Sequence, residues 1–186
     1  SVALVVMVAL GVLAIRRIVR AQAQAEANQL LAEKRSGDAE QLMDFMLGDL
    51  SEKLAPIGKL ALLESVAQKA VGFYGDRTEG ATATQRQRQA LAHRKLSEAL
   101  LEKGDSENAL AALQRANAIW QQLRTERPND IVIRAGAATN ASALATALDW
   151  VGQGAESVTM KGHALAELEQ VVLDPAGQRW RLDLGK

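Results

Sequence analysis

The stretch GDSENALAALQRANAIW, residues 104–120, decides the fold that we expect for this chain. It begins with Gly104 and Asp105, a pair typical of a turn that leads into a helix N-cap. Apolar residues then recur at three- and four-residue spacing. The pattern predicts a helix that begins at Asp105 or Ser106 and ends near residue 126, before Pro128.

The composition favours an all-α fold for the whole chain of 186 residues. Hydrophobic residues make up 48% of the chain but aromatic residues only 3%, and there are only 3 prolines. The apolar content is therefore mainly alanine, leucine and valine, which speaks against a β-sandwich or barrel. Lys+Arg and Asp+Glu both number 22, and this neutral balance argues against a general nucleic-acid binder.

Helical periodicity predicts five further helices, at about 39–54, 60–75, 84–103, 130–151 and 155–173. We place the cap of the 84–103 helix at Thr84, with Gln87 three residues later. The 39–54 helix has an expected apolar face made of Leu42, Phe45, Met46, Leu50 and Leu54, with Asp49 among them. The 60–75 helix has one made of Leu60, Leu63, Val66, Ala67, Ala70 and Phe73–Tyr74.

The two helix pairs between residues 84 and 175 repeat with a period near 48. A shift of 48 matches Leu96 to Leu144, Leu100 to Leu148, Gly104 to Gly152, Ala116 to Ala164 and Leu123 to Val171. Helix–turn–helix units that recur at a fixed period are typical of a solenoid, in which each unit buries its apolar face on its neighbour.

The 104–120 stretch resembles the second half of a tetratricopeptide repeat. In that family small residues lie where two helices touch, at positions matched here by Ala109 and Ala116, with Leu113 at the bulky position between them. The chain departs from the family where His93 replaces a frequent Trp and Ser157 replaces an expected Ala. The resemblance implies two such repeats over residues 84–175, packed through Leu96, Leu100, Gly104, Ala109, Leu113, Ala116, Leu144, Leu148, Gly152 and Ala164.

The same resemblance implies a partner-binding groove, because the first helix of each pair lines the concave face of such arrays. The residues expected on that side are Arg94, Glu98 and Leu101 in the first pair and Ser142, Thr146 and Asp149 in the second. Arg94 and Glu98 do not match the clamp that family members use for C-terminal carboxylates. That class of ligand is therefore not indicated.

Residues 2–15, VALVVMVALGVLAI, are unbroken apolar or small residues, followed by Arg16, Arg17 and Arg20. A helix that spans a bilayer needs about 20 residues, so we interpret residues 1–20 as a transmembrane segment truncated at its N-terminus. A signal peptide, which carries its charges before the apolar run, and a buried core helix are the alternatives. The arginines favour a cytoplasmic soluble part, and a periplasmic one stays open because the other flank is not in the sequence.

Residues 21–37 are interpreted as a helical stalk, 38–80 as an amphipathic helical pair and 176–186 as the start of a further helix. The stretch 41–74 resembles the helical pair that follows the span in bacterial membrane-anchored tetratricopeptide proteins. Those proteins often carry an N-terminal signalling or effector module. The resemblance therefore implies a fragment of a larger, single-pass protein of the bacterial inner membrane.

Catalytic chemistry is not indicated by the sequence. The absence of cysteine excludes thiolate catalysis and cysteine-bound metal, and His93 and His163 fit no metal-binding motif. His163 with Glu167 is interpreted as a pair on a helix surface. We expect no enzyme and no cofactor, but a scaffold for a protein or peptide partner. The alternative is a homo-oligomeric membrane element that assembles itself and has no separate ligand.

Overall fold

The computed structural model describes residues 37–50, 60–75 and 80–174, together with single positions between 22 and 53. The chain divides into two compact units, Ser1–Asp44 and Phe45–Lys186, and in the first unit residues 37–44 are helical. The predicted transmembrane segment at 1–20 and further helix at 176–186 lie outside the described residues, as does most of the predicted stalk.

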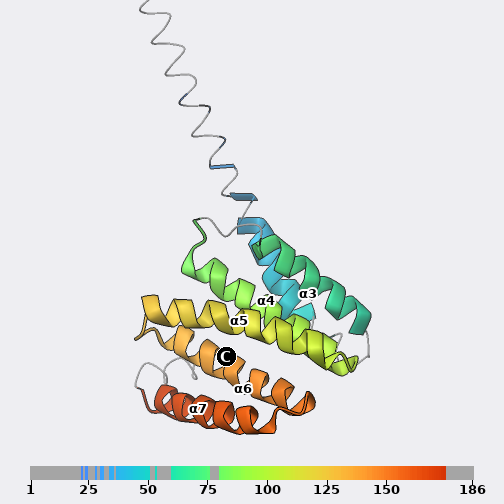
Figure 1. Ribbon diagram of the computed structural model, residues 1–186. Coiled ribbons are helices and arrows are strands. Elements are labelled where there is room, and N and C mark those ends of the chain that lie inside the picture. Colours follow the sequence, from blue (N-terminus) through green and yellow to red (C-terminus); the bar gives the residue numbers. More distant parts are fainter. Residues whose placement is uncertain are drawn as a thin grey trace, which may run out of the picture. The chain divides into compact units, whose positions relative to one another are not determined.

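The second unit is a stack of antiparallel helices (Figure 1). They are α3 (Leu60–Gly75), α4 (Ala83–Glu102), α5 (Ser106–Glu126), α6 (Ile131–Trp150) and α7 (Gly154–Leu173). Each helix contacts the next one along the chain, and α4 also contacts α6. The part of the chain that the structure describes contains helices and no strand, which confirms the all-α prediction. These five helices begin and end within one residue of their predicted bounds.

The prediction for the helix at 39–54 was wrong about its buried face. Residues 37–45 are α-helical, but Met46–Leu50 form a π-helix, η1. Leu47, which the α-helical spacing left out, is buried, whereas Leu42 and Phe45 are 55% and 49% exposed. A π-helix bonds residue i to i+5, so it moves Leu47 away from the position that an α-helix would give it. Leu42 and Phe45 precede the π-helix.

The N-cap of α4 is Thr82 and not the predicted Thr84. The Gln85 backbone N–H donates to the Thr82 hydroxyl at 3.2 Å, and the Thr82 N–H donates to the Gln85 side chain at 3.0 Å. The pattern Thr-x-x-Gln occurs twice here, at 82–85 and again at 84–87, so the sequence offered two capping boxes two residues apart. The first is used because Thr82 has the extended backbone that a cap requires, just after the left-handed Gly80.

The turns between α4 and α5 and between α6 and α7 have the same structure. Gly104 and Gly152 both have left-handed backbones, with φ of +83° and +80°. The residue after each glycine donates its N–H back into the helix, Asp105 to Leu100 O at 2.9 Å and Gln153 to Leu148 O at 2.8 Å. These are the bonds of a Schellman-type helix end. The two helix pairs are thus joined by one turn that recurs 48 residues later.

The core between these helices is rich in alanine. One cluster joins α4, α5 and α6 through Ala83, Ala90, Ala116, Trp120, Leu123, Ile133 and Ala137. A second joins α5, α6 and α7 through Leu113, Leu144, Ala147 and Leu148, with Leu110, Ala143 and Met160 packed against it. Seven of the ten residues expected to pack the repeats are buried: Leu100, Ala109, Leu113, Ala116, Leu144, Leu148 and Ala164. Leu96 is half-buried, and Gly104 and Gly152 are exposed in the turns. Small side chains let the helix axes approach closely.

Ser157, which stands where an alanine was expected, is fully buried and hydrogen-bonded. Its hydroxyl donates to the Ala145 carbonyl of α6 at 2.7 Å. One repeat earlier the equivalent positions are Ala109 and Ser97, so the serine has changed helices within the pair. In both pairs one serine and one alanine occupy the two equivalent positions, so both side chains stay small. The hydrogen bond offsets the free-energy cost of burying the Ser157 hydroxyl.

Helix α6 is, among the described residues, long and apolar enough to cross a membrane by length and composition. Half of that apolar stretch is buried inside the structure, where α6 packs between α5 and α7. Its apolar character is thus used in packing the stack.

Candidate partner-binding groove

A hollow of about 530 Å³ lies between α4 and α6. It is lined by Thr84, Gln87, Arg88, Leu91 and Arg94 of α4, Trp120 of α5, and Val132, Ala135, Gly136 and Thr139 of α6. The α6 residues are the first four α4 residues shifted by 48, so equivalent positions of the two helix pairs form the two sides. We call this hollow the α4/α6 groove.

Trp120 and Gly136 form the base of the α4/α6 groove. A Cβ atom on Gly136 would overlap Cη2 of the Trp120 ring and lie 2.7 Å from Cζ2 and Cζ3. Trp120 is only 7% exposed, so a ring that is pushed away from Gly136 gives up the packing contacts that bury it. Only glycine lets the ring lie directly on the α6 backbone, and this contact joins the two helix pairs.

The sides of the α4/α6 groove combine apolar and basic side chains. Leu91 and the 44%-exposed Val132 add apolar surface, and Arg88 and Arg94 add positive charge. None of the lining residues is acidic. The Arg94 guanidinium donates to Glu98 one turn later on α4, which holds the arginine along the helix. An apolar base beside arginines is a surface typical of protein interfaces.

Of the six residues predicted for the groove, the structure places Arg94 in its lining and the other five outside it. Glu98 and Leu101 continue the same row along α4, and Ser142, Thr146 and Asp149 continue the row on α6. Asp149 pairs with Lys161 of α7, and this bond, with a further contribution from Ser157, lowers the pKa of the Asp149 carboxyl. The prediction therefore chose the rows that line the hollow, but at positions nearer the C-terminal ends of both helices.

Gly136 and Trp120 were missed, although the sequence contained a signal for them. Glycine inside a helix destabilises it by about 1 kcal/mol relative to alanine, so an isolated glycine in an alanine-rich helix suggests a packing reason. Gly136 is such a residue. The partner of the contact could not be read from the sequence, because it comes from another helix.

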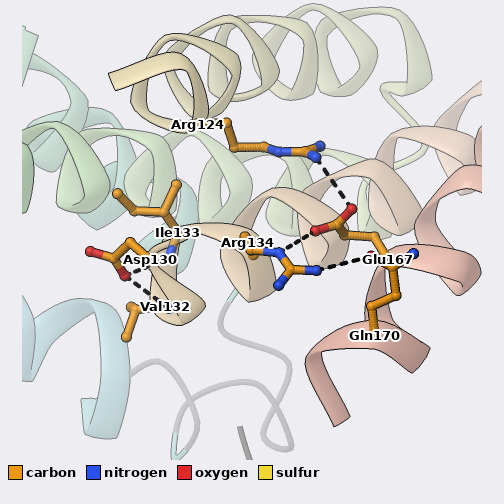
Figure 2. A network of polar contacts seen from close by, with 7 residues as sticks. All are labelled: Arg124, Asp130, Val132, Ile133, Arg134, Glu167 and Gln170. Atoms are coloured by element: carbon orange, nitrogen blue, oxygen red, sulfur yellow. Dashed lines mark hydrogen bonds and ion pairs between the residues drawn. The ribbon is translucent and has the colours of Figure 1, made fainter. Parts of the chain in front are cut away.

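A second hollow, of about 460 Å³, lies among α5, α6 and α7 and is more polar. Glu167, one of its lining residues, lies between Arg124 and Arg134 (Figure 2). Its carboxylate accepts from Arg134 Nε at 2.7 Å and from Arg124 Nη2 at 3.2 Å, and Arg134 also donates to Gln170 at 3.1 Å. Glu167 therefore ties three helices together, which the interpretation of His163 and Glu167 as a surface pair did not foresee.

The two histidines have different surroundings. His93 on α4 is 5% exposed, and its Nδ1 atom has no hydrogen-bond partner. Burial lowers the pKa of His93, and the positive charge of Arg115 lowers it further. His163 on α7 is exposed. Within the described ranges, no three His, Asp or Glu side chains are grouped so that they could hold a metal ion.

Comparisons with protein-family models, with curated proteins and with solved structures find no match to this chain.

Proposed function

We propose that this chain is a membrane-anchored protein–protein interaction module whose tetratricopeptide-like helix pairs hold a protein or peptide partner. It would couple recognition of that partner, or oligomerisation, to a module outside this sequence. The observation that carries the proposal is the α4/α6 groove, an apolar hollow between the first helices of two equivalent pairs. The recurring glycine turns and the burial of seven of the ten expected packing residues support the repeat interpretation.

The surroundings of the groove define the chemistry of its partner. An apolar side chain fits above Trp120, since the hollow has the volume of an ordinary binding pocket. Arg88 and Arg94 make the edge of the groove polar, and Arg94 is paired there with Glu98. The partner is therefore an amphipathic segment, apolar on the side that enters the hollow and polar at its edge.

The membrane anchor in this proposal is the apolar run at 2–15 with the arginines that follow it. The soluble part is placed in the cytoplasm. Because the chain has no cysteine, a Leu62→Cys variant gives it one exposed thiol, on α3. We expect a membrane-impermeant maleimide to label this variant in lysed cells and not in intact spheroplasts. Labelling in intact spheroplasts contradicts the cytoplasmic location.

The groove itself is tested with a photo-crosslinking amino acid at Val132, in the full chain in its membrane. Val132 lines the groove, and Leu62 on α3 is an equally exposed control. We expect a specific crosslinked partner from position 132 and none from position 62. The same partner from both positions, or none from position 132, contradicts the proposal.

A matched pair of threonine variants then measures binding of the purified partner. Thr139 lines the groove and Thr125 lies on α5, and each is an exposed helical residue whose hydroxyl donates to the carbonyl four residues earlier. Thr139→Trp fills the hollow and is expected to weaken binding about tenfold or more, whereas Thr125→Trp leaves it unchanged. Equal affinities of the two variants would rule out the groove as the binding site.

A further inference from the structure

Helix α7 has a stripe on its exposed side that is apolar except for Glu169. The stripe consists of Ala155, Val158, Gly162, Leu165, Glu169 and Val172, all of which are exposed. Val158 and Leu165 are 69% and 60% exposed. Successive members are three and four residues apart in alternation, which is the spacing of the core positions in a coiled coil. We call this set the α7 stripe.

Two positions of the α7 stripe correspond to α5 residues that contact the following helix pair. Shifted back by 48 residues, Val158 corresponds to Leu110, which packs with Leu113 against Leu144 of α6. Val172 corresponds to Arg124, which reaches Glu167 on α7. Helix α7 is the last helix of the described stack (Figure 1). Val158 and Val172 of the α7 stripe therefore continue an established interface, whereas the equivalents of Ala155, Gly162 and Glu169 are exposed on α5.

We propose that a second copy of this chain covers the α7 stripe, with the two α7 helices antiparallel about a two-fold axis. The stripe is symmetric about the point between His163 and Ala164, so each of its positions meets another member of the same set in the second copy. Leu165 lies against Gly162 of the second copy, and Val172 lies against its Ala155. A large residue is thus opposite a small one in two of the three layers, and the third layer pairs Val158 with Glu169. The same patch is used on both subunits, as a two-fold interface requires.

Gly162 gives this arrangement its strongest local support. It lies in the middle of α7, and a Cβ atom at this position would meet nothing within 4 Å. Nothing among the described residues therefore requires a glycine here, although glycine destabilises a helix interior. In the dimer the missing side chain leaves the space that Leu165 of the second copy fills.

This dimer does not depend on the proposed partner site. It uses α7, whereas the α4/α6 groove lies on α4 and α6 and keeps its lining in the dimer. A contact made through one helix from each copy is near the lower end of interface size. We therefore expect a weak dimer that has to be measured over a wide range of chain concentration.

Cysteine crosslinking tests the antiparallel contact in the full chain, held in detergent micelles. The chain has no cysteine of its own, so Gly162→Cys and Leu165→Cys each provide a single thiol. We expect a mixture of the two variants to form the mixed disulfide at least about tenfold faster than either variant forms its own. Faster disulfide formation by Leu165→Cys alone would show a parallel contact. No disulfide in any sample would show that α7 meets no second copy. Either result overturns the proposal.

Two further variants separate association from folding. Leu165→Glu is expected to weaken self-association about 100-fold, because a two-fold contact counts each substitution twice. Leu62→Glu on α3 changes an equally apolar exposed residue and should leave self-association unchanged. If the Leu165→Glu variant associates as strongly as the unmodified chain, the proposal is overturned. This is also the result expected if the apolar N-terminal segment alone assembles the chain.

Gly162→Leu distinguishes the dimer contact from a role in helix stability. Leucine favours a helix more than glycine does, so thermal unfolding of this variant should occur at the same or a higher temperature than in the unmodified chain. Self-association should nevertheless be lost, because the new side chain fills the space for Leu165. A variant that still associates as the unmodified chain does contradicts the proposal.

Discussion

The two helix pairs, α4–α5 and α6–α7, share a backbone turn but differ in what covers their second helix. On α5, Leu113 and Trp120 are buried in the clusters shared with α6. The equivalent positions on α7 are Lys161, which is exposed, and Leu168, which is half-buried. The turn and the small packing residues therefore define the repeat, whereas the outward face of each second helix depends on its own neighbour.

The largest expected effect tests the joint between the pairs. We expect Gly136→Ala to lower the free energy of unfolding by about 2–3 kcal/mol, because the new methyl group overlaps the Trp120 ring and forces it out of a packed site. The loss should outweigh the gain of about 1 kcal/mol that alanine brings to a helix. Chemical denaturation of the full chain measures the difference.

Gly162→Ala is the matched control for that variant. The substitution is the same and also lies inside a helix, but nothing lies within 4 Å of the added atom. Unfolding of the monomer should therefore require up to about 1 kcal/mol more free energy than in the unmodified chain. If both glycine variants are stabilised, the contact between Trp120 and Gly136 is not close enough to join the pairs.

A smaller effect tests whether the two turns are equivalent. Gly104→Ala and Gly152→Ala each force an L-residue into a left-handed backbone, which destabilises the fold by about 1–2 kcal/mol. Neither added Cβ atom meets another atom within 4 Å, so the backbone penalty acts alone. We expect losses of equal size from the two variants in denaturant unfolding. A clear difference between the two losses would show that the two turns contribute differently to the free energy of unfolding, although their sequences correspond.

The smallest effect concerns pH and is confined to the first pair. Burial, with the charge of Arg115, lowers the pKa of His93 below 6.5, so the unfolded chain binds the proton more tightly than the folded chain does. Stability should therefore fall as the pH drops below about 6.5 toward the pKa of folded His93. The position one repeat later is Ala141, which does not titrate.

Melting temperatures of the His93→Gln variant over the same pH range test this source. The fall of the melting temperature with decreasing pH should become smaller in His93→Gln. It should be unchanged in the control variant His163→Gln, which changes the exposed histidine of α7. An unchanged slope in His93→Gln would assign the acid sensitivity to other groups.

Much of the fold was predictable because its determinants are local. Gly104 and Gly152 each follow the end of a helix, where a left-handed backbone is needed and glycine adopts it without strain. The spacing of apolar residues in 60–75 likewise predicts the buried face at Val66, Ala67 and Ala70. The cap of α4 was misplaced by two residues because two identical capping patterns overlap. The π-helix at Met46–Leu50 escaped because the α-helical period was assumed throughout.

The candidate site was less predictable than the fold because it depends on contacts between helices. The period of 48 identified the two rows on α4 and α6, but only tertiary packing determines where along those rows a hollow forms. The Trp120 ring on Gly136 closes its base, and the two residues come from α5 and α6. Glu167 likewise finds its arginines on two other helices.

The carboxylate of Glu167 also has a mechanical consequence. It lies on α7 and binds arginines on α5 and α6, so it acts as a brace across three successive helices. A pull on α7 is therefore passed to α5 through Arg124 as well as through α6 and the connection at Pro128. We expect the described stack to bear tension as one stiff body until the ion pairs of Glu167 break, and only then to bend between its two helix pairs.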